Sequence, residues 1–170
     1  RVLDVGCGAG RVLLHLQEKG LECVGVDDSS LAVKACRERG VKDARVISIT
    51  RLGPQLGKFD SILMFGNNFG LFSNVDRARR LLRRFRSFTA EDARIIVTTF
   101  DPHQTVKPEH RAYQRRNVAR GRTIGQFRLR IRYMRFATPY YDYLFVSKPE
   151  LTGILRGTGW HVTRWVDSAG

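Results

Sequence analysis

Short apolar runs recur along the first hundred residues, and each run ends in glycines or polar residues. Runs of this length, rich in valine and isoleucine, are typical of buried β-strands. The pattern predicts five strands. They are expected within residues 1–5, 22–30, 44–49, 59–68 and 93–102.

Helical patterns fill several intervals between these strands, over residues 11–20, 31–40 and 77–88. Residues that can cap a helix precede the second and third of them. The candidate caps are Ser29 or Ser30, and Asn74 or Asp76. Strands that alternate with helices predict the α/β class, with a doubly wound, mostly parallel sheet.

The pattern changes after residue 120. Apolar and polar positions alternate in residues 124–136, which is typical of a half-buried strand. Residues 137–139 form a predicted turn, and residues 140–147 a return strand. Together they predict an antiparallel two-strand insertion within residues 121–147, before the last helix. A helix and a final strand are then expected, over residues 148–159 and 160–166.

The length of 170 residues suits one core, so residues 1–170 are predicted to form a single domain. The first residue already lies inside the first strand, and we expect the domain to be truncated at both ends. No apolar run approaches the ~20 residues that span a bilayer, so no membrane partner is expected. The three cysteines lack metal-ligand spacing, which predicts no metal site and reduced thiols in a cytoplasmic protein.

Three glycines follow the first strand at alternate positions, Gly6, Gly8 and Gly10. Glycine permits positive φ angles and close approach, so this loop is expected to bind a ligand. Dinucleotide-binding folds need the spacing G-x-G-x-x-G, and Arg11 stands at the place of its third glycine. The preceding acid, Asp4, also favours a cationic group over a phosphate. Spacing and charge therefore argue against a nicotinamide or flavin site.

The stretch VLDVGCGAG resembles the first motif of class I S-adenosylmethionine-dependent methyltransferases, and GVDDS resembles their second. The resemblance implies an enzyme with a Rossmann-like methyltransferase fold, strand order 3-2-1-4-5, that uses S-adenosyl-L-methionine. It implies that Asp27 accepts both ribose hydroxyls and that Asp4 neighbours the methionyl amino group. The alternative is that these two acids only cap helices. The other implied cofactor contacts are Gly6, Cys7, Gly8, Gly10, Asp28, Ile49, Thr50 and Phe65.

The third motif departs from the family pattern. Relatives often carry an acid near the adenine amino group, whereas the stretch VISITRL has Ile49 and Thr50 there. Backbone groups of Ile49 or the hydroxyl of Thr50 could take that role. Asp28 also stands where the family often has an apolar residue against adenine.

The resemblance implies that the stretch LMFGNNFGLF, residues 63–72, faces the reactive methyl group. It lacks the N/D-P-P-Y/F pattern of enzymes that methylate base amines. It resembles the G-N-S-F stretch of glycine-type small-molecule N-methyltransferases, with Asn67 at the asparagine. The resemblance implies methyl transfer to a small molecule at nitrogen, by in-line displacement that depends mainly on positioning. Asn67 and Asn68 are expected substrate contacts, unless they only stabilise a turn.

His103 follows the fifth strand and is, with Asn67, a candidate catalytic residue, since imidazole can act as a base near neutral pH. It is also expected to contact the substrate, although a loop histidine can be incidental. Nearby aromatic side chains either wall the acceptor pocket or pack beneath the insertion. These are Tyr113, Tyr140 and Tyr141.

The net charge of +14 keeps a second acceptor class open. Arg128, Arg130 and Arg132 line one side of the inserted strand, where they could bind an anionic small substrate, an RNA backbone or only water. The alternatives to a small-molecule enzyme are thus a tRNA or rRNA methyltransferase and a non-catalytic nucleic-acid-binding protein. No signature of an RNA-binding module accompanies the arginines, so a small-molecule acceptor is preferred.

Overall fold

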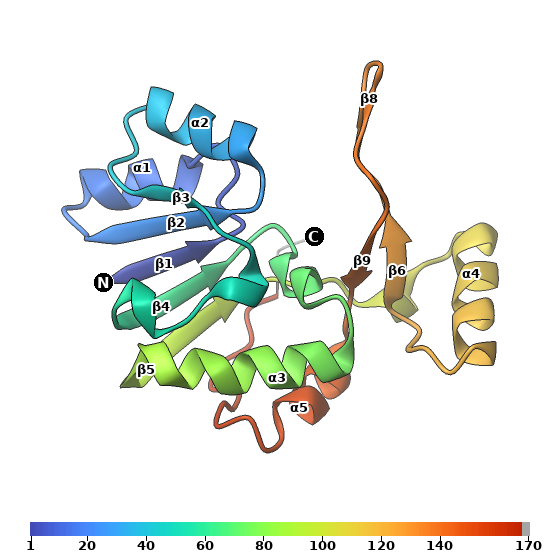
Figure 1. Cartoon of the computed structure of the whole chain (residues 1–170). Coiled ribbons are helices and arrows are strands. Elements are labelled where there is room, and N and C mark those ends of the chain that lie inside the picture. Colours follow the sequence, from blue (N-terminus) through green and yellow to red (C-terminus); the bar gives the residue numbers. More distant parts are fainter. Residues whose placement is uncertain (168–170) are drawn as a thin grey trace.

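The computed structural model of the chain describes residues 1–167, apart from the side chains of residues 133 and 136. Five parallel strands form one sheet in the order β3-β2-β1-β4-β5, which confirms the expected order. Their bounds are β1 Val2–Val5, β2 Cys23–Asp27, β3 Ala44–Val46, β4 Phe59–Met64 and β5 Thr89–Val97. The carboxyl ends of these strands point toward the centre of the molecule in Figure 1.

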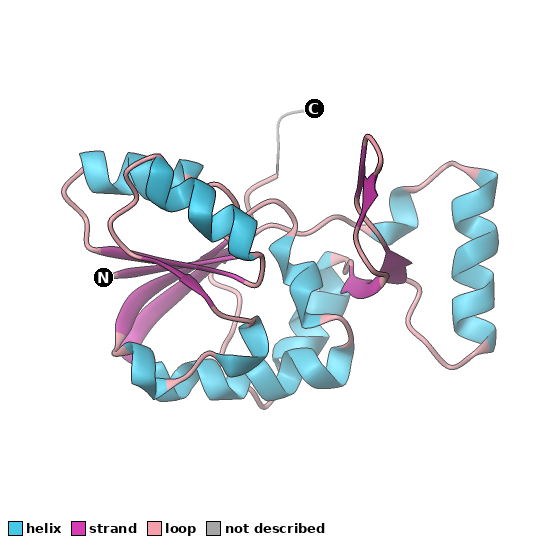
Figure 2. Cartoon of the chain, turned by 45° about the horizontal axis from the view of Figure 1, so that its top comes forward, coloured by secondary structure: helices cyan, strands magenta, loops and turns pink. Residues whose placement is uncertain are grey.

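Helices cover both faces of the sheet, which gives three layers (Figures 1 and 2). One face carries α1 (Arg11–Glu18) and α2 (Ser30–Glu38), and the other carries α3 (Val75–Phe85) and α5 (Lys148–Leu155). Short 3-10 helices lie between the longer elements of residues 1–167: η1 Ile49–Arg51, η2 Pro54–Leu56, η3 Asn68–Phe72, η4 Arg86–Phe88 and η5 Pro102–Gln104. Within residues 1–167, none of the helices has the length and apolar character that crossing a bilayer requires.

The larger of two apolar clusters lies between the sheet and α3. The apolar face predicted for this helix is confirmed, since Leu81, Leu82 and Phe85 are buried there. Phe59, Phe69, Phe72 and Phe88 complete the cluster's aromatic side chains. Burying each such side chain contributes about 1.5–3 kcal/mol. This cluster fixes the strands beneath the loops that follow them.

The two helix caps that the sequence left open are now assigned. Ser29 accepts a hydrogen bond from the backbone N–H of Ala32, and Asn74 accepts one from Arg77. In α5, Ser147 and Glu150 form a capping box.

A separate group of elements lies between β5 and α5 in the chain, and we call residues 108–144 the α4–β9 segment. It contains α4 Pro108–Ala119, β6 Gln126–Leu129, β7 Arg132–Tyr133, β8 Phe136–Ala137 and β9 Tyr141–Leu144. The antiparallel pairing of β6 with β9 confirms the predicted insertion. The helix α4 was not predicted, because its buried residues are the polar Gln114 and Asn117 and it shows no apolar period.

Two expectations about the chain after residue 130 are wrong. The turn predicted at 137–139 lies earlier, between β7 and β8, where Met134 has a φ of 51°. The strand predicted at 160–166 is absent from the described residues. Trp160 instead packs against the larger apolar cluster and donates from Nε1 to the carbonyl of Leu82, and the chain after it does not pair with β5.

Candidate functional site

The glycine loop lies at the carboxyl ends of β1 and β2. The backbone N–H groups of Gly6 and Cys7 both donate to the carbonyl of Val26, at 2.8 and 3.1 Å. These two bonds place the loop beside Asp27, the last residue of β2. In open parallel sheets this edge is the usual ligand-binding edge.

The carboxylate of Asp27 is held in place by two backbone groups. Its Oδ2 accepts from the N–H of Gly8 at 3.0 Å, and its Oδ1 accepts from the N–H of Ser29 at 2.9 Å. A carboxylate can accept about four hydrogen bonds, so both oxygens retain a lone pair for a ligand. The group is thus oriented and still able to bind two vicinal hydroxyls.

Asp4 is a buried carboxylic acid without a hydrogen-bond donor among the described residues. The residue is 3% exposed. Burial, and next the charge of Asp27, raise its pKa from 3.8 to about 6. A buried carboxylate without a partner is costly, and a cationic group placed beside it would remove that cost.

Gly6 contacts the loop that follows β4. The Nδ2 of Asn68 donates to the carbonyls of Val5 and Gly6, at 2.9 and 3.0 Å. Asn68, predicted as a substrate contact, therefore uses its amide nitrogen to join the two loops. Gly6 has a φ of +74°, and a Cβ there would clash with Nδ2 of Asn68.

We expect Gly6→Ala to destabilise the protein by about 2 kcal/mol, because the left-handed backbone alone costs an alanine about 1–2 kcal/mol. Gly8→Ala is the matched control. Gly8 also has a positive φ, of +54°, but a Cβ there would meet nothing within 4 Å. Thermal unfolding should therefore show a larger loss for Gly6→Ala. Equal losses for the two variants would contradict the contact between Gly6 and Asn68.

Cys7 and Gly10 of the glycine loop lie against Cys36 of α2. A Cβ on Gly10 would lie 2.6 Å from Cγ2 of Val41 and 2.9 Å from Sγ of Cys36, so this glycine permits close helix packing. The sulfur of Cys7 lies 4.0 Å from that of Cys36. Burial raises the pKa of both thiols. The thiol of Cys7 thus lies against that of Cys36 in α2.

The three residues expected near adenine follow β2 and β3, with Asp28 directly after β2 and Ile49 and Thr50 in η1. The N–H of Ile47 donates to the carbonyl of Asp27 at 2.9 Å. This bond holds the chain just before η1 against the end of β2. Ile49 packs on the larger apolar cluster, and the Thr50 hydroxyl lies 3.1 Å from that of Ser48. Phe65 packs with the smaller cluster and Asp28 is exposed.

Asn67 has a left-handed backbone, with a φ of 65°. Its N–H donates to Oγ1 of Thr98 and its carbonyl accepts from the hydroxyl of Tyr143, both at 2.8 Å. The Tyr143 ring lies against Gly70, where any Cβ would clash with it. Burial, and next the charge of Tyr141, raise the pKa of Tyr143 to about 12, so the hydroxyl stays a donor. The Asn67 amide side chain has no partner among the described residues.

Tyr143 and Thr98 hold the backbone of Asn67, and the sequence analysis did not identify either residue. Tyr143→Phe removes one of the two hydrogen bonds that the Asn67 carbonyl accepts, the other coming from the N–H of Gly70 at 2.9 Å. We expect a loss of about 0.5–1.5 kcal/mol of stability. The backbone amides of the η3 loop should also exchange their hydrogens faster. Tyr140→Phe is the control, since Tyr140 is 54% exposed. Unchanged exchange at Asn67 and Gly70 would show that the hydroxyl does not hold this loop.

The ribbon formed by β6 and β9 has two different faces. Phe127 lies opposite Tyr143 in the ladder, and Leu129 lies opposite Tyr141. This face contacts the strand ends, since Tyr143 binds Asn67 and the charge of Asp28 contributes to the raised pKa of Tyr141, after burial. Of the three tyrosines considered as walls of the acceptor pocket, Tyr141 is therefore the one that lies beside the strand ends.

The other face of the ribbon carries the charged residues. Arg128 lies opposite Asp142 in the ladder, and the guanidinium groups of Arg128 and Arg130 lie 5.9 and 4.9 Å from the ring centre of Tyr140. Tyr113 instead stacks on Phe127 at 5.2 Å. The arginines thus lie on the face turned away from Asn67.

His103 does not join the strand-end residues. Its Nδ1 lies 2.9 Å from Oδ1 of Asp101, and the residue lines a different cavity beside α4. Within residues 1–167, no contact connects it to Asp4, Asp27 or Asn67.

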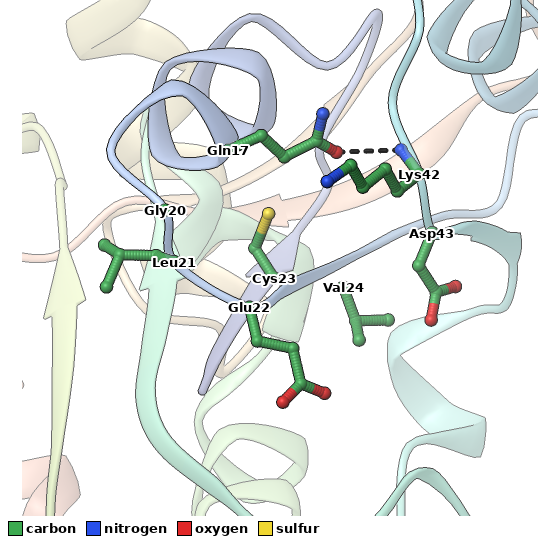
Figure 3. Close-up of a pocket in the computed structure, with 8 residues that line it drawn as sticks. All are labelled: Gln17, Gly20, Leu21, Glu22, Cys23, Val24, Lys42 and Asp43. Carbon is green, nitrogen blue, oxygen red and sulfur yellow. Dashed lines mark hydrogen bonds between the residues drawn. The ribbon is translucent and has the colours of Figure 1, made fainter.

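A further cavity, of about 330 Å³, lies at the amino end of β2 (Figure 3). Cys23 and Val24, the first residues of this strand, line it together with Gln17, whose Oε1 accepts from the N–H of Lys42 at 2.8 Å. Since Asp27 ends the same strand, this cavity is at the opposite edge of the sheet from the glycine loop. It is not part of the site.

Comparison with known proteins agrees with this geometry. A family model described as a methyltransferase domain matches residues 2–92. The chain belongs to this family. The match covers β1 to β4, the glycine loop and Asp27, and it ends within β5. The α4–β9 segment of this methyltransferase domain lies outside the matched residues.

Individual relatives of this methyltransferase domain are distant. A protein of Geobacillus sp. (strain WCH70) named as a methyltransferase is 25% identical over 116 residues, which are 65% of this chain and 45% of that protein. A tRNA U34 carboxymethyltransferase of Tolumonas auensis is 29% identical over 125 residues, 69% of this chain and 38% of that enzyme. The chain therefore spans less than half the length of these curated relatives.

Among solved structures, an S-adenosylmethionine-dependent methyltransferase of Bacteroides fragilis, in complex with S-adenosyl-L-homocysteine, is similar with a TM-score of 0.75. The two chains are 25% identical, and the alignment covers 92% of this methyltransferase domain and 62% of the other chain. The likeness thus extends beyond the residues that match the family model.

Proposed function

We propose that this domain binds S-adenosyl-L-methionine at the strand ends and transfers its methyl group to an acceptor. The observation that carries the proposal is the pairing of a buried, unpartnered Asp4 with an oriented Asp27 across the glycine loop. When bound, the cofactor supplies a methyl group on a positively charged sulfur. The S-adenosyl-L-homocysteine bound in the Bacteroides fragilis relative supports the same ligand class here.

The residues present fit this cofactor. Asp27 would accept the two ribose hydroxyls, and Asp4 would neutralise the ammonium group of the methionyl end. The backbone of Gly6, Cys7 and Gly8 would lie against the ligand, where the open space around Gly8 leaves room. Ile49, Thr50 and Asp28 would surround the adenine, and Phe65 would be a further cofactor contact. In a chain with a net charge of +14, these acids also lower the repulsion of a cationic ligand.

The acceptor that we propose is a small molecule methylated at nitrogen. The free amide side chain of Asn67 can bind an amine, and its backbone is fixed on both sides by Thr98 and Tyr143. Tyr141 would form the opposite wall of the acceptor site, beside Asp28. Rate enhancement then comes mainly from holding the amine in line with the methyl group. We assign no proton transfer to His103, which lies beside Asp101 in a separate cavity.

A tRNA or rRNA acceptor is the second candidate function. It is favoured by the similarity to a tRNA-modifying enzyme of Tolumonas auensis. The α4–β9 segment adds a strongly cationic surface, with nine arginines and two acids. The small molecule remains the first choice because the arginines of the ribbon face away from Asn67.

We also propose that residues 1–170 act as a single domain of a cytoplasmic protein, with the ribbon as an insertion. The three cysteines are free, and two of their sulfur atoms lie 4.0 Å apart without a bond. Unbonded thiols at this distance fit a reducing compartment.

Two measurements test the proposal. Calorimetric titration should show binding of S-adenosyl-L-homocysteine, and no binding would exclude the cofactor site. A panel of amines and a tRNA fraction should then be incubated with methyl-labelled S-adenosyl-L-methionine. Label in a small amine supports the first acceptor class, and label only in RNA overturns it in favour of the second.

A further inference from the structure

A cavity of about 510 Å³ lies between η5 and α4, outside the strand-end site. Its lining consists of His103, Arg111, Gln114, Arg115, Val118 and Ile124. In Figure 1, α4 stands at the far side of the α4–β9 segment from the sheet. The cavity therefore uses residues that take no part in the proposed methyl transfer.

Two arginines one helical turn apart dominate its charge. The Nε of Arg111 donates to the carbonyl of Thr105 at 3.1 Å, which orients this guanidinium group. In the part of the chain that the structure describes, neither Arg111 nor Arg115 pairs with an acid. Like charges at this helical spacing repel by about 0.2–0.5 kcal/mol. A bound anion would remove this repulsion.

The other lining groups favour an anion with an attached apolar part. Gln114 is 6% exposed and is fixed by a bond from its Nε2 to the carbonyl of Pro102. Val118, 60% exposed, and the part-buried Ile124 supply apolar surface at the same cavity. Asp101, whose Oδ1 lies 2.9 Å from Nδ1 of the lining residue His103, also accepts from the backbone N–H of His103.

We infer that this cavity binds the phosphate group of a phosphate ester, with Arg111 and Arg115 as its ligands. Guanidinium groups bind two phosphate oxygens at once, which favours phosphate over a simple halide. Val118 and Ile124 contact the organic part of the ester. The inference goes beyond the proposed methyl transfer and does not depend on it.

The phosphate could belong to a free small molecule or to a nucleic-acid backbone. Six more arginines of the same segment form no ion pair with a described residue. They are Arg116, Arg120, Arg122, Arg128, Arg130 and Arg132. They raise the local potential for either source, so the experiment needs one arm for each.

The experiment is a calorimetric titration of the whole chain with uridine 5′-monophosphate and with uridine, in low salt. Saturating S-adenosyl-L-homocysteine blocks the strand-end site in both. Fluorescence anisotropy with a labelled oligouridylate that lacks a terminal phosphate forms the second arm. We expect the monophosphate to bind and uridine not to bind. Arg111→Gln/Arg115→Gln should weaken phosphate binding at least about tenfold, because charge-assisted hydrogen bonds are lost.

Arg80→Gln/Arg83→Gln is the matched control, since it removes the same charge from two exposed arginines on the outer face of α3. This control should change the affinity for uridine 5′-monophosphate by less than about twofold. Binding of the oligonucleotide alone, with the same dependence on Arg111 and Arg115, would assign the cavity to a backbone phosphate. Equal losses in both double variants, equal binding of uridine, or no binding in either arm would overturn the inference. Arg115→Gln alone serves if the double variant unfolds.

Discussion

Asp27→Ala is expected to weaken the binding of S-adenosyl-L-homocysteine by about 100-fold or more. Two hydrogen bonds from the ribose hydroxyls to a carboxylate would be lost, each worth about 1.5–3 kcal/mol. The carboxylate also holds the N–H groups of Gly8 and Ser29, so the glycine loop loses its orientation as well. Isothermal titration calorimetry of the folded variant measures this loss.

The control for this variant is Asp92→Ala, which removes an exposed carboxylate from β5. Its affinity should match that of the unmodified chain. Thermal unfolding of both variants separates loss of binding from loss of folding. If Asp27→Ala binds S-adenosyl-L-homocysteine as tightly as the control does, the ribose does not lie at the end of β2.

Asp4→Asn is expected to stabilise the ligand-free protein at pH 8 by about 3 kcal/mol. Burial raises the pKa of Asp4 from 3.8 to about 6, so ionisation of this group is more costly in the folded state than in the unfolded state. Each pKa unit corresponds to about 1.36 kcal/mol. In a protein of this size, such a gain raises the melting temperature by about 6–12 °C.

The pH dependence gives the sign of this effect. Because the folded state binds the proton more tightly, stability falls as the pH rises from about 4 to about 6, and the deficit is complete above that. Asparagine does not ionise, so the difference between the two proteins should fall to about 0.5 kcal/mol at pH 4, close to the unfolded pKa of 3.8. Melting temperatures at pH 4 and pH 8, with Asp92→Asn as control, test this. A variant no more stable than the unmodified chain at pH 8 would be the contrary result.

The same substitution should have the opposite effect on ligand binding. The ammonium group of the cofactor favours the ionised form of Asp4, and asparagine cannot supply that charge. Asp4→Asn should therefore be more stable and yet bind S-adenosyl-L-homocysteine more weakly. Such a trade of stability against binding is typical of a functional acid.

The sheet and the cofactor loop could be predicted because their signals are local. Apolar runs ended by Gly6, Gly8 and Gly10 define β1 and the loop, and parallel pairing brings Asp4 and Asp27 to one edge. The sequence alone offers no reason to reject the strand predicted at residues 160–166. Its apolar residues fit a strand equally well, and only the tertiary position of Trp160 removes them from the sheet.

The acceptor side was harder to predict because its contacts join distant parts of the chain. The sequence indicates Asn67, but its partners Thr98 and Tyr143 are 31 and 76 residues away. The helix α4 has no apolar period, and Pro108 in its first turn is its clearest local signal. His103 follows the expected strand, yet the 3-10 helix η5 carries it to another cavity.

The bonds from Asn68 to Val5 and Gly6 have a consequence for redesign of this protein. They tie the loop after β4 to the cofactor loop, while Tyr143 ties the same loop to the ribbon. Substitutions in this loop that broaden the range of acceptors would thus also change the binding of the nucleoside. Selection for a new substrate should then use a limiting concentration of cofactor, so that variants with weaker cofactor affinity are discarded early.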